Sequence, residues 1–323
     1  MAARFGLGLA ALGRPGYINL GHAQDLNANY AIGAMRKHAH SVFDAAWELG
    51  VRYFDAARSY GRAEEFLASW LEERDIDPDA IEVGSKWGYT YTAAWKVQTP
   101  EGIAHEIKRH ELKVLQSQFQ SSVNLLRSHL GLYQIHSATL QSGVLENQDV
   151  LRCLEGLRKA GIKIGLTVSG VDQPQTIDRA LEIRFDDKPL FSSVQATWNV
   201  LETSATETLQ RAHRSGLSVI IKEALANGRL TTRNDSESFS DTRKELEAIA
   251  KENDSTIDAI CLAAALNQPW VTTVLSGAAN VDHLRSNLKA ADVQWSRAIQ
   301  NRLSGLAQTP EVYWSQRAAL AWN

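Results

Sequence analysis

The stretch FSSVQATWNVLETSATETLQRAHRSGLSVIIKEAL, residues 191–225, sets out how this chain is organised. A run rich in β-branched and aromatic residues (191–199) is followed by a helix-like segment, TETLQRAHRS, and then by a second apolar run (217–225). Short apolar runs that alternate with amphipathic segments are typical of parallel strands joined by crossover helices. The stretch therefore predicts a strand–helix–strand unit of a parallel sheet.

The same alternation extends outward in both directions. Five more apolar runs follow helix-like segments, and FGLGLAALG (5–13) adds another near the start. Eight strands alternating with helices in about 300 residues fit an α/β fold of the (β/α)8 TIM barrel type. We expect residues 1–323 to form a single barrel domain with a C-terminal tail from about residue 295. The five runs are VRYFD (51–55), AIEVGSKW (80–87), LYQIHS (132–137), GIKIGLTVSG (161–170) and WVTTVLSG (270–277).

A doubly wound dinucleotide-binding fold is the alternative. Residues 6–11, GLGLAA, match the loose form of a glycine-rich phosphate fingerprint. That motif requires a helix to begin at its second glycine. Gly13, Pro15 and Gly16 follow within a few residues and would interrupt such a helix. We therefore interpret this segment as a strand and a turn.

Composition excludes several classes of protein. The net charge is −3, which favours neither nucleic acid nor an anionic membrane as a partner. The two cysteines, Cys153 and Cys261, lie in apolar helix-like segments and exclude a disulfide framework and a zinc site. His38 and His40 are not spaced as a helical metal pair, so we predict no metal.

Targeting signals are also weak. The N-terminal segment MAARFGLGLAALG is a poor signal peptide because its apolar stretch is short. No apolar run approaches the roughly 20 residues of a membrane span. We therefore expect a cytoplasmic protein. The long polar stretch 229–245 predicts a mobile loop after a strand.

Four groups capable of proton transfer stand at or just after the ends of successive predicted strands. Asp55 ends one run and Tyr60 follows five residues later, while Lys86 and His136 lie near the ends of the next two. In a parallel barrel these ends meet at one face. Tyrosine has a pKa of about 10, which a neighbouring ammonium such as Lys86 would lower. Asp55 would keep Lys86 charged, and His136 would orient a carbonyl oxygen. The set predicts carbonyl reduction or alcohol oxidation by hydride transfer.

These motifs resemble those of the aldo-keto reductase family. FDAARSYG is similar to the strand-two motif of that family, GSKWG to its lysine motif and YQIHS to its histidine motif. The resemblance covers most of the chain and implies a (β/α)8 barrel. It also implies a nicotinamide cofactor lying across the barrel mouth and a catalytic tetrad formed by Asp55, Tyr60, Lys86 and His136.

The resemblance further implies which residues bind the cofactor. Gln195 matches the glutamine that contacts the nicotinamide carboxamide, and Thr167 stands where a serine is typical. Lys222 occupies the position of a ring that stacks on the nicotinamide; its stem would cover that face while its ammonium meets a phosphate. The remaining positions implied along the pyrophosphate and the adenosine phosphate are Leu225, Asn227, Gly228, Arg229, Gly277, Ala278, His283 and Asn287.

The choice of nicotinamide cofactor and of substrate stays open at this point. NADP is the family default, but Ala279 replaces the arginine that often binds its 2′-phosphate, so NAD or dual use remains an alternative. Trp87 and Tyr89 follow Lys86 and are predicted to line the substrate pocket. The expected substrate is a small carbonyl compound or a sugar, and the protein resembles an aldose dehydrogenase-like member.

Two other functions remain possible for such a sequence. The first is a non-catalytic nucleotide-binding regulatory subunit of the same fold, although an intact tetrad argues against it. The second is a barrel lyase or aldolase that uses Lys86 as a Schiff base, which requires Lys86 to be free of Asp55.

Overall fold

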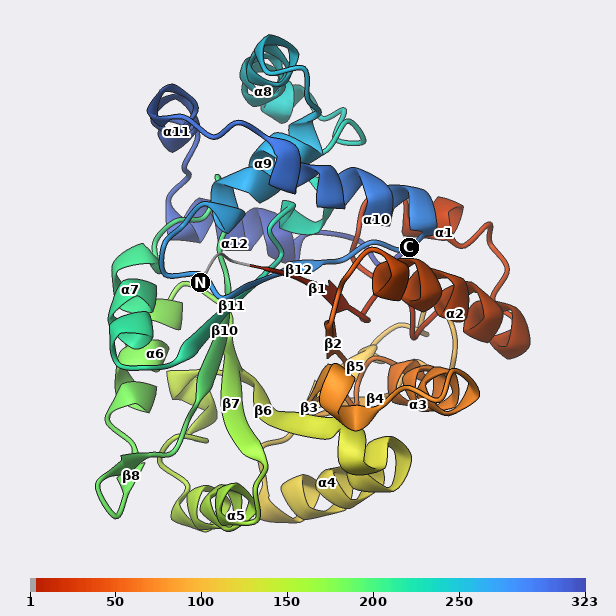
Figure 1. The fold of residues 1–323 in the computed structure, drawn as a ribbon, viewed down its shortest axis with the longest axis vertical. Helices are drawn as coiled ribbons and strands as arrows, with labels where there is room; N and C mark the ends of the chain where they lie inside the picture. The colour runs from red at the N-terminus through yellow and green to blue at the C-terminus, as the bar shows by residue number, and fades with distance from the viewer. Residues whose placement is uncertain (1–3) are drawn as a thin grey trace.

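The computed structural model describes residues 4–323 and contains a closed barrel of parallel strands (Figure 1). The strand order is β1-β12-β11-β10-β7-β6-β3-β2, so the sheet closes on itself and the (β/α)8 prediction is confirmed. Residues 1–3 of the predicted domain lie outside the described part. The strands are β1 (Arg4–Gly8), β2 (Tyr53–Asp55), β3 (Glu82–Trp87), β6 (Leu130–Ala138), β7 (Lys163–Val168), β10 (Ser193–Thr197), β11 (Ser218–Lys222) and β12 (Thr273–Ser276).

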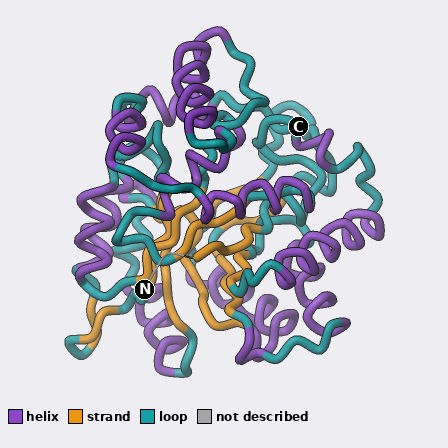
Figure 2. The backbone as a smooth tube through the Cα atoms, turned by 45° about the horizontal axis from the view of Figure 1, so that its top comes forward, coloured by secondary structure: helices purple, strands orange, loops and turns teal. Residues whose placement is uncertain are grey.

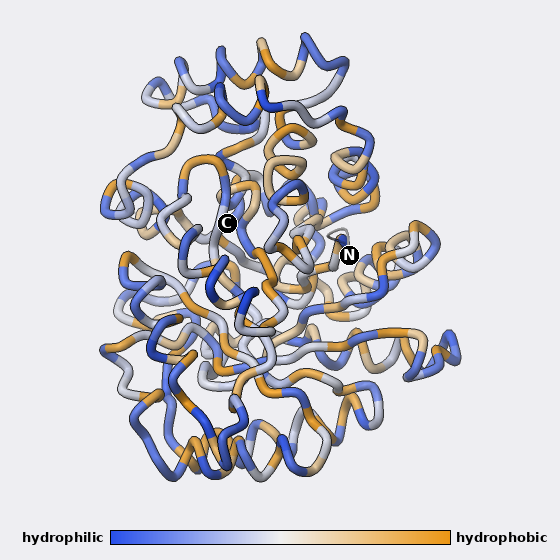
Figure 3. The backbone as a smooth tube through the Cα atoms, turned by 60° about the vertical axis from the view of Figure 1, so that its left-hand side comes forward, coloured by the Kyte–Doolittle hydropathy of each residue, from blue (hydrophilic) through white to orange (hydrophobic). Residues whose placement is uncertain are grey.

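A ring of helices surrounds the barrel, with the strands inside (Figure 2). Most of these helices are amphipathic, and Figure 3 shows hydrophilic and hydrophobic residues alternating along them. In α5, for example, Val150, Leu151 and Leu154 are buried against the barrel. The helices of the ring are α2 (Ile32–Glu48), α3 (Ala63–Glu73), α4 (Leu112–Leu126), α5 (Gln148–Lys159), α6 (Gln173–Leu181), α7 (Thr206–Arg214), α9 (Ile257–Leu266) and α10 (Val281–Leu288).

The polar stretch 229–245 is partly helical. It joins β11 to α9, as a loop after a strand should, but a 3-10 turn at Glu237–Phe239 leads directly into α8 (Ser240–Glu252). This helix buries Leu246 and Ile249 and lies outside α9 (Figure 1). Because α8 covers one side of α9, nearly the whole of α9 can be apolar.

Smaller elements lie outside the repeating pattern. A short helix, α1 (His22–Asp25), follows β1, and α11 (Arg297–Ser304) and α12 (Pro310–Ala318) follow the barrel. Two antiparallel hairpins interrupt the connections, β4 (Tyr89–Tyr91) with β5 (Glu106–Lys108), and β8 (Arg184–Phe185) with β9 (Lys188–Pro189).

The structure also bears on the cysteines and histidines. Both cysteines are free, and Cys261 is fully buried in the core. His38 Nε2 lies 2.5 Å from the Ala279 carbonyl, and His40 Nε2 lies 3.1 Å from the Phe66 carbonyl. Within residues 4–323, no cluster of three or more His, Cys, Asp or Glu side chains could hold a metal ion. In the same range, no helix is long and apolar enough to cross a membrane.

Candidate active site

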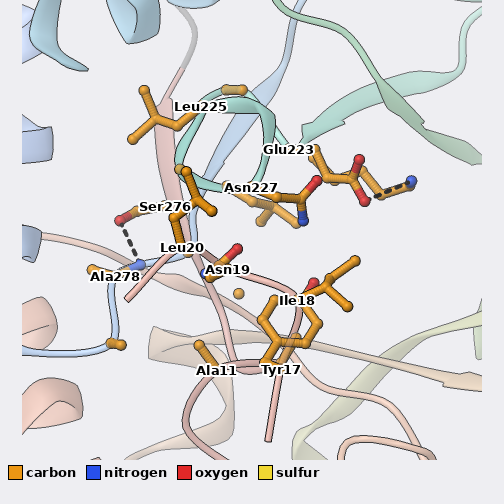
Figure 4. A pocket seen from close by; sticks show the side chains of 18 of the residues that line it. Ala11, Tyr17, Ile18, Asn19, Leu20, Glu223, Leu225, Asn227, Ser276 and Ala278 are labelled. Carbon is orange, nitrogen blue, oxygen red and sulfur yellow. Dashed lines mark hydrogen bonds and ion pairs between the residues drawn. The ribbon is translucent and has the colours of Figure 1, made fainter. Parts of the chain in front are cut away.

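A cavity of about 640 Å³ opens at the carboxyl ends of the barrel strands. One wall is the segment after β1, which includes Tyr17 and Leu20, and it faces Leu225 and Asn227 from the loop after β11 (Figure 4). The two walls touch, because the Leu20 N–H donates to the Asn227 carbonyl at 3.1 Å. Active sites of barrel enzymes lie at this face, so we take the cavity as the candidate active site.

The four predicted proton-transfer groups meet at the floor of this cavity. Lys86 is fully buried, and its Nζ bonds the Asp55 carboxylate, the Ala56 carbonyl at 2.8 Å and the Tyr60 hydroxyl at 3.4 Å. The rings of Tyr60 and His136 meet edge to face with centroids 5.5 Å apart. Asp55, Tyr60 and His136 line the cavity, while Lys86 lies beneath them.

Asp55 is the centre of a buried hydrogen-bond network. Its Oδ1 accepts from the Tyr53 hydroxyl at 3.0 Å, from Gln134 Nε2 at 3.2 Å and from Gln195 Nε2 at 3.0 Å. These neutral donors and the Lys86 ammonium satisfy the carboxylate without water. Gln195 therefore has a positioning contact at one end of its amide and also lines the cavity.

The pKa directions suit a site that donates a proton. Burial, and then the Asp55 carboxylate, hold the pKa of Tyr60 well above its usual value near 10, so the hydroxyl keeps its proton at neutral pH. The pKa of Tyr60 is thus raised, contrary to the lowering expected from Lys86, and the cation that opposes the rise is Arg14. Burial, followed by the charge of Lys86, holds the pKa of His136 well below 6.5, so His136 is neutral.

Arg14 is a site residue that the sequence analysis missed. It is 2% exposed, and its guanidinium carbon lies 5.3 Å from the Tyr60 ring centre and 4.8 Å from that of Trp322. Its Nη1 donates to the Ser59 carbonyl at 3.1 Å and to Glu106 at 2.9 Å. A buried guanidinium thus joins the Tyr60 loop, the β4–β5 hairpin and the C-terminal tail.

The Tyr60 loop is held by a close backbone approach at Gly13. The Arg62 N–H donates to the Gly13 carbonyl at 2.7 Å. A Cβ added at Gly13 would clash with the Tyr60 carbonyl and lie 2.5 Å from Ala63 Cβ. The glycine that the sequence analysis interpreted only as a helix breaker is therefore needed for the position of Tyr60.

We expect Gly13→Ala to lower the free energy of unfolding by about 1–3 kcal/mol, because overpacking forces the backbone apart. The displaced Tyr60 should also reduce turnover by about tenfold or more. Denaturant unfolding and steady-state turnover measure the two effects. Gly33→Ala is the matched control, since a Cβ at this position of α2 meets nothing within 4 Å. Equal behaviour of the two variants would contradict the prediction.

Of the two residues predicted to line the substrate pocket, only Tyr89 lines the cavity. Tyr89 lines the cavity, and its ring meets that of His136 with centroids 4.9 Å apart. Trp87 is absent from the cavity lining; it is fully buried in the hydrophobic core and packs edge to face on His110 at 5.5 Å. The prediction for Trp87 is wrong because consecutive strand residues point to opposite faces, and Lys86 takes the inward one.

Most of the predicted cofactor residues line the same cavity, and Arg229 is the exception. Its Nε donates to the Ala226 carbonyl at 3.0 Å, and its Nη1 donates to Gln316 at 3.1 Å. Its guanidinium also lies 4.3 Å from the Tyr313 ring centre, so Arg229 anchors α12 and is turned away from the cavity. The lining residues are Thr167, Gln195, Lys222, Leu225, Asn227, Gly228, Gly277, Ala278, His283 and Asn287.

The end of β7 places Thr167 and Ser169 at the cavity. The Thr167 hydroxyl faces the cavity and accepts the Ser137 N–H at 2.7 Å. Val168, the next residue, is fully buried in the core. Ser169 lines the cavity two residues after Thr167. Strand alternation places 167 and 169 on one side, and this signal could have identified Ser169 from the sequence.

A second arginine that the sequence did not predict as a site residue, Arg233, lies at the end of the cavity near α10. Arg233, from the loop after β11, bonds both carboxylate oxygens of Asp25, at 2.9 and 2.5 Å. Its Nη2 is also 3.3 Å from His283 Nε2, at the start of α10. Arg233 thus brings an arginine to the region where Ala279 left none, although Asp25 already neutralises its charge.

The C-terminal tail forms part of the cavity wall. Tyr17 and Asn323 exchange two backbone hydrogen bonds at 3.1 and 3.0 Å, and the Trp322 ring stacks on His105 at 4.0 Å. In α12, Arg317 Nη2 donates to Glu223 at 2.6 Å. Trp322 and Arg317 both line the cavity. No sequence pattern pointed to these contacts, because they join segments about 100 to 300 residues apart.

Comparisons with known proteins agree with the geometry. A model of the Aldo/keto reductase family matches residues 6–307. The uncharacterized oxidoreductase YqkF of Bacillus subtilis (strain 168) is 23% identical over 283 residues, covering 82% of this chain and 85% of that protein. The uncharacterized oxidoreductase C215.11c of Schizosaccharomyces pombe is 25% identical over 260 residues, covering 79% and 74%.

A solved structure shares the fold. The aldo-keto reductase AKR11C1 from Bacillus halodurans, in its holo form, superposes with a TM-score of 0.69 at 18% identity, covering 95% of this chain and 93% of that one. Together, the closed barrel and these matches define an oxidoreductase with a (β/α)8 fold. More particularly, the chain belongs to the aldo/keto reductase family.

Proposed function

We propose that this protein reduces an aldehyde or ketone, or oxidises the corresponding alcohol, with a nicotinamide cofactor and with Tyr60 as the proton donor. The observation that carries the proposal is the buried chain of contacts from Asp55 through Lys86 to the Tyr60 hydroxyl, 3.4 Å from Lys86 Nζ. The same contacts weigh against a Schiff-base role, since Lys86 is fully buried and paired with Asp55.

The chain's own residues supply every proton-handling part of this reaction. When bound, the nicotinamide supplies or accepts the hydride. Tyr60 donates its proton to the carbonyl oxygen, and the buried Lys86 ammonium stabilises the phenolate that remains. Neutral His136 donates a hydrogen bond to the same oxygen and so orients the carbonyl. Asp55, which is held by three neutral donors, keeps Lys86 charged and in place.

The cavity fits an extended dinucleotide. Hydroxyl and amide groups of Thr167, Ser169 and Gln195 at one end suit a carboxamide. At the other end, the amides at the start of α10 and the Arg233 guanidinium suit a phosphate. The buried Asn227 Oδ1 has no partner among the described residues, and Asn227 lines the cavity, so this oxygen can accept a hydrogen bond from a ligand.

The substrate end supports a small polar carbonyl compound, including an open-chain or cyclic sugar. Tyr89 and Trp322 supply aromatic surface, and the Arg14–Glu106 pair supplies charged hydrogen-bonding groups beside Tyr60. A polyol suits this end better than a purely apolar aldehyde, because aromatic rings pack against its C–H faces and charged groups bind its hydroxyls.

A spectrophotometric panel tests the proposal. Purified protein is mixed with NADH or NADPH and with aldehydes, ketones and aldoses, and consumption of the reduced cofactor is followed. We expect turnover with at least one polar carbonyl substrate, or reduction of the oxidised cofactor by a sugar. If reduced cofactor binds but no member of the panel turns over in either direction, the proposed reaction is wrong.

Asp25 gives a prediction about cofactor preference. We expect Asp25→Asn to raise the affinity for NADPH relative to NADH by about threefold to tenfold, because it frees the Arg233 guanidinium for a charge-assisted contact with the 2′-phosphate. Fluorescence titration of both cofactors measures the ratio. Asp282→Asn, at an exposed position in the first turn of α10, is the control for loss of one negative charge nearby. An equal change in the two variants would assign the effect to general electrostatics.

A further inference from the structure

Among residues 4–323, Lys222 is the one cation lining the catalytic half of the cavity that has no carboxylate of its own. Lys222 Nζ donates to Thr197 Oγ1 at 2.8 Å, and its nearest carboxylate oxygen, in Glu223, lies 3.9 Å away. The Glu223 carboxylate already accepts hydrogen bonds from Arg317 Nε and Nη2. Three neighbouring cations each have their own carboxylate, in the pairs Lys86–Asp55, Arg14–Glu106 and Arg317–Glu223.

The position of Lys222 matters for the proposed hydride transfer. Lys222 is the last residue of β11, which stands four places from β3 in the closed order of eight strands. It therefore lies across the barrel mouth from Lys86 and Tyr60. The hydride and the proton must reach two ends of one carbonyl group, so a nicotinamide serving Tyr60 has to lie between these two walls. Lys222 lines the cavity on the far wall.

We propose that Lys222 makes the site distinguish the two redox states of the cofactor, weakening the binding of the positively charged oxidised ring relative to the neutral reduced ring. The inference rests on the proposed function. The nicotinamide ring is neutral when reduced and carries one positive charge when oxidised. Water screens a nearly buried ammonium beside the ring only a little, so the repulsion between the ammonium and the oxidised ring is strong.

The ratio of two affinities isolates this effect. The diphosphate has the same charge in both redox states, so any attraction between it and Lys222 cancels when the two dissociation constants are divided. A contact between the Lys222 ammonium and a phosphate would change both constants together. Only a charge close to the ring changes their ratio.

The charge on Lys222 also depends on pH. The pKa of Lys222 is lowered to about 8, chiefly by burial. The charges of Arg317 and Lys86 act in the same direction, and those of Glu223 and Asp55 oppose them. The ammonium is therefore present at pH 7 and is lost as the pH rises through about 8. Because Glu223 has its pKa held at about 2, chiefly by Arg317 against the effect of burial, it stays charged across this range.

Equilibrium binding of the reduced and oxidised cofactors to the full chain tests the inference without any turnover. The dissociation constants are measured by fluorescence quenching or dialysis for wild type, Lys222→Met and Lys222→Arg. We expect Lys222→Met to bring the oxidised-to-reduced ratio down by about tenfold, while Lys222→Arg keeps it. In wild type alone, the ratio should fall between pH 7 and about pH 9.5, as the ammonium is lost. This second arm needs no variant to fold.

The outcomes distinguish failure of the inference from failure of the proposed function. Equal weakening of both redox forms in Lys222→Met, with the ratio unchanged in the variant and across the pH range, would place the ammonium on the phosphates and overturn the inference. Binding of neither form to wild type would instead overturn the proposed function. A lowered ratio in both Lys222→Met and Lys222→Arg would show that shape, not charge, is responsible, which also overturns it.

Discussion

Tyr60→Phe is expected to reduce kcat/KM for carbonyl reduction by about 10²–10⁴-fold, the usual contribution of a positioned general acid. The variant loses only the hydroxyl that lies 3.4 Å from Lys86 Nζ. The ring contacts with His136 and Arg14 are kept, so the loop and the fold should be unchanged. Steady-state kinetics with the best substrate of the panel measures the loss.

Two comparisons make the Tyr60 result decisive. Cofactor affinity in Tyr60→Phe should stay within about twofold of wild type, since the hydroxyl acts on the carbonyl oxygen. Tyr30→Phe, at a half-buried position outside the cavity lining, removes the same group and should keep full activity. Unchanged turnover in Tyr60→Phe would exclude Tyr60 as the proton donor.

We expect Lys86→Met to lower both the stability of the protein and its activity by a large amount. Removing the ammonium leaves the buried Asp55 carboxylate with neutral donors only, and breaking a buried pair in this way costs about 3–5 kcal/mol. Turnover should fall at least as far as in Tyr60→Phe, because the Lys86 ammonium no longer stabilises the Tyr60 phenolate. Denaturant unfolding and steady-state kinetics measure the two losses.

The double variant Lys86→Met with Asp55→Asn separates the two effects. Neutralising Asp55 removes the unpaired buried charge, so stability should return in large part while activity stays lost. Lys163→Met serves as the surface control, since this lysine of β7 is 65% exposed and pairs only loosely with Glu82 at 3.6 Å. A stable and active Lys86→Met variant would contradict the assigned role of the Asp55–Lys86 pair.

Local sequence patterns were sufficient to predict the fold and the four residues proposed to transfer protons. Apolar runs alternating with amphipathic segments predict strands and helices, and their number and order then leave the closed parallel barrel as the fold. Asp55, Tyr60, Lys86 and His136 come at or just after the ends of successive strands, and the barrel topology brings such positions to one face whatever the details of packing. The structure places all four together.

Two predicted side chains turned away from the cavity for different reasons. Trp87 follows Lys86 directly on a strand, and the two-residue alternation excludes it from the face that Lys86 occupies. Arg229 lies in a loop where no such alternation applies, and its direction is set by Tyr313 and Gln316 of α12. The first error could have been avoided from the sequence, whereas the second could not.

The sequence by itself determined the barrel and the strand-end chemistry, because both follow from short-range periodicity repeated along one chain. Only the tertiary structure decided that Arg14 lies against Tyr60 and Trp322, that Arg233 pairs with Asp25, and that Lys222 is left without a carboxylate of its own. These facts depend on which distant side chains meet. Long charged side chains reach in many directions, so their partners are fixed by packing and charge balance in the folded molecule.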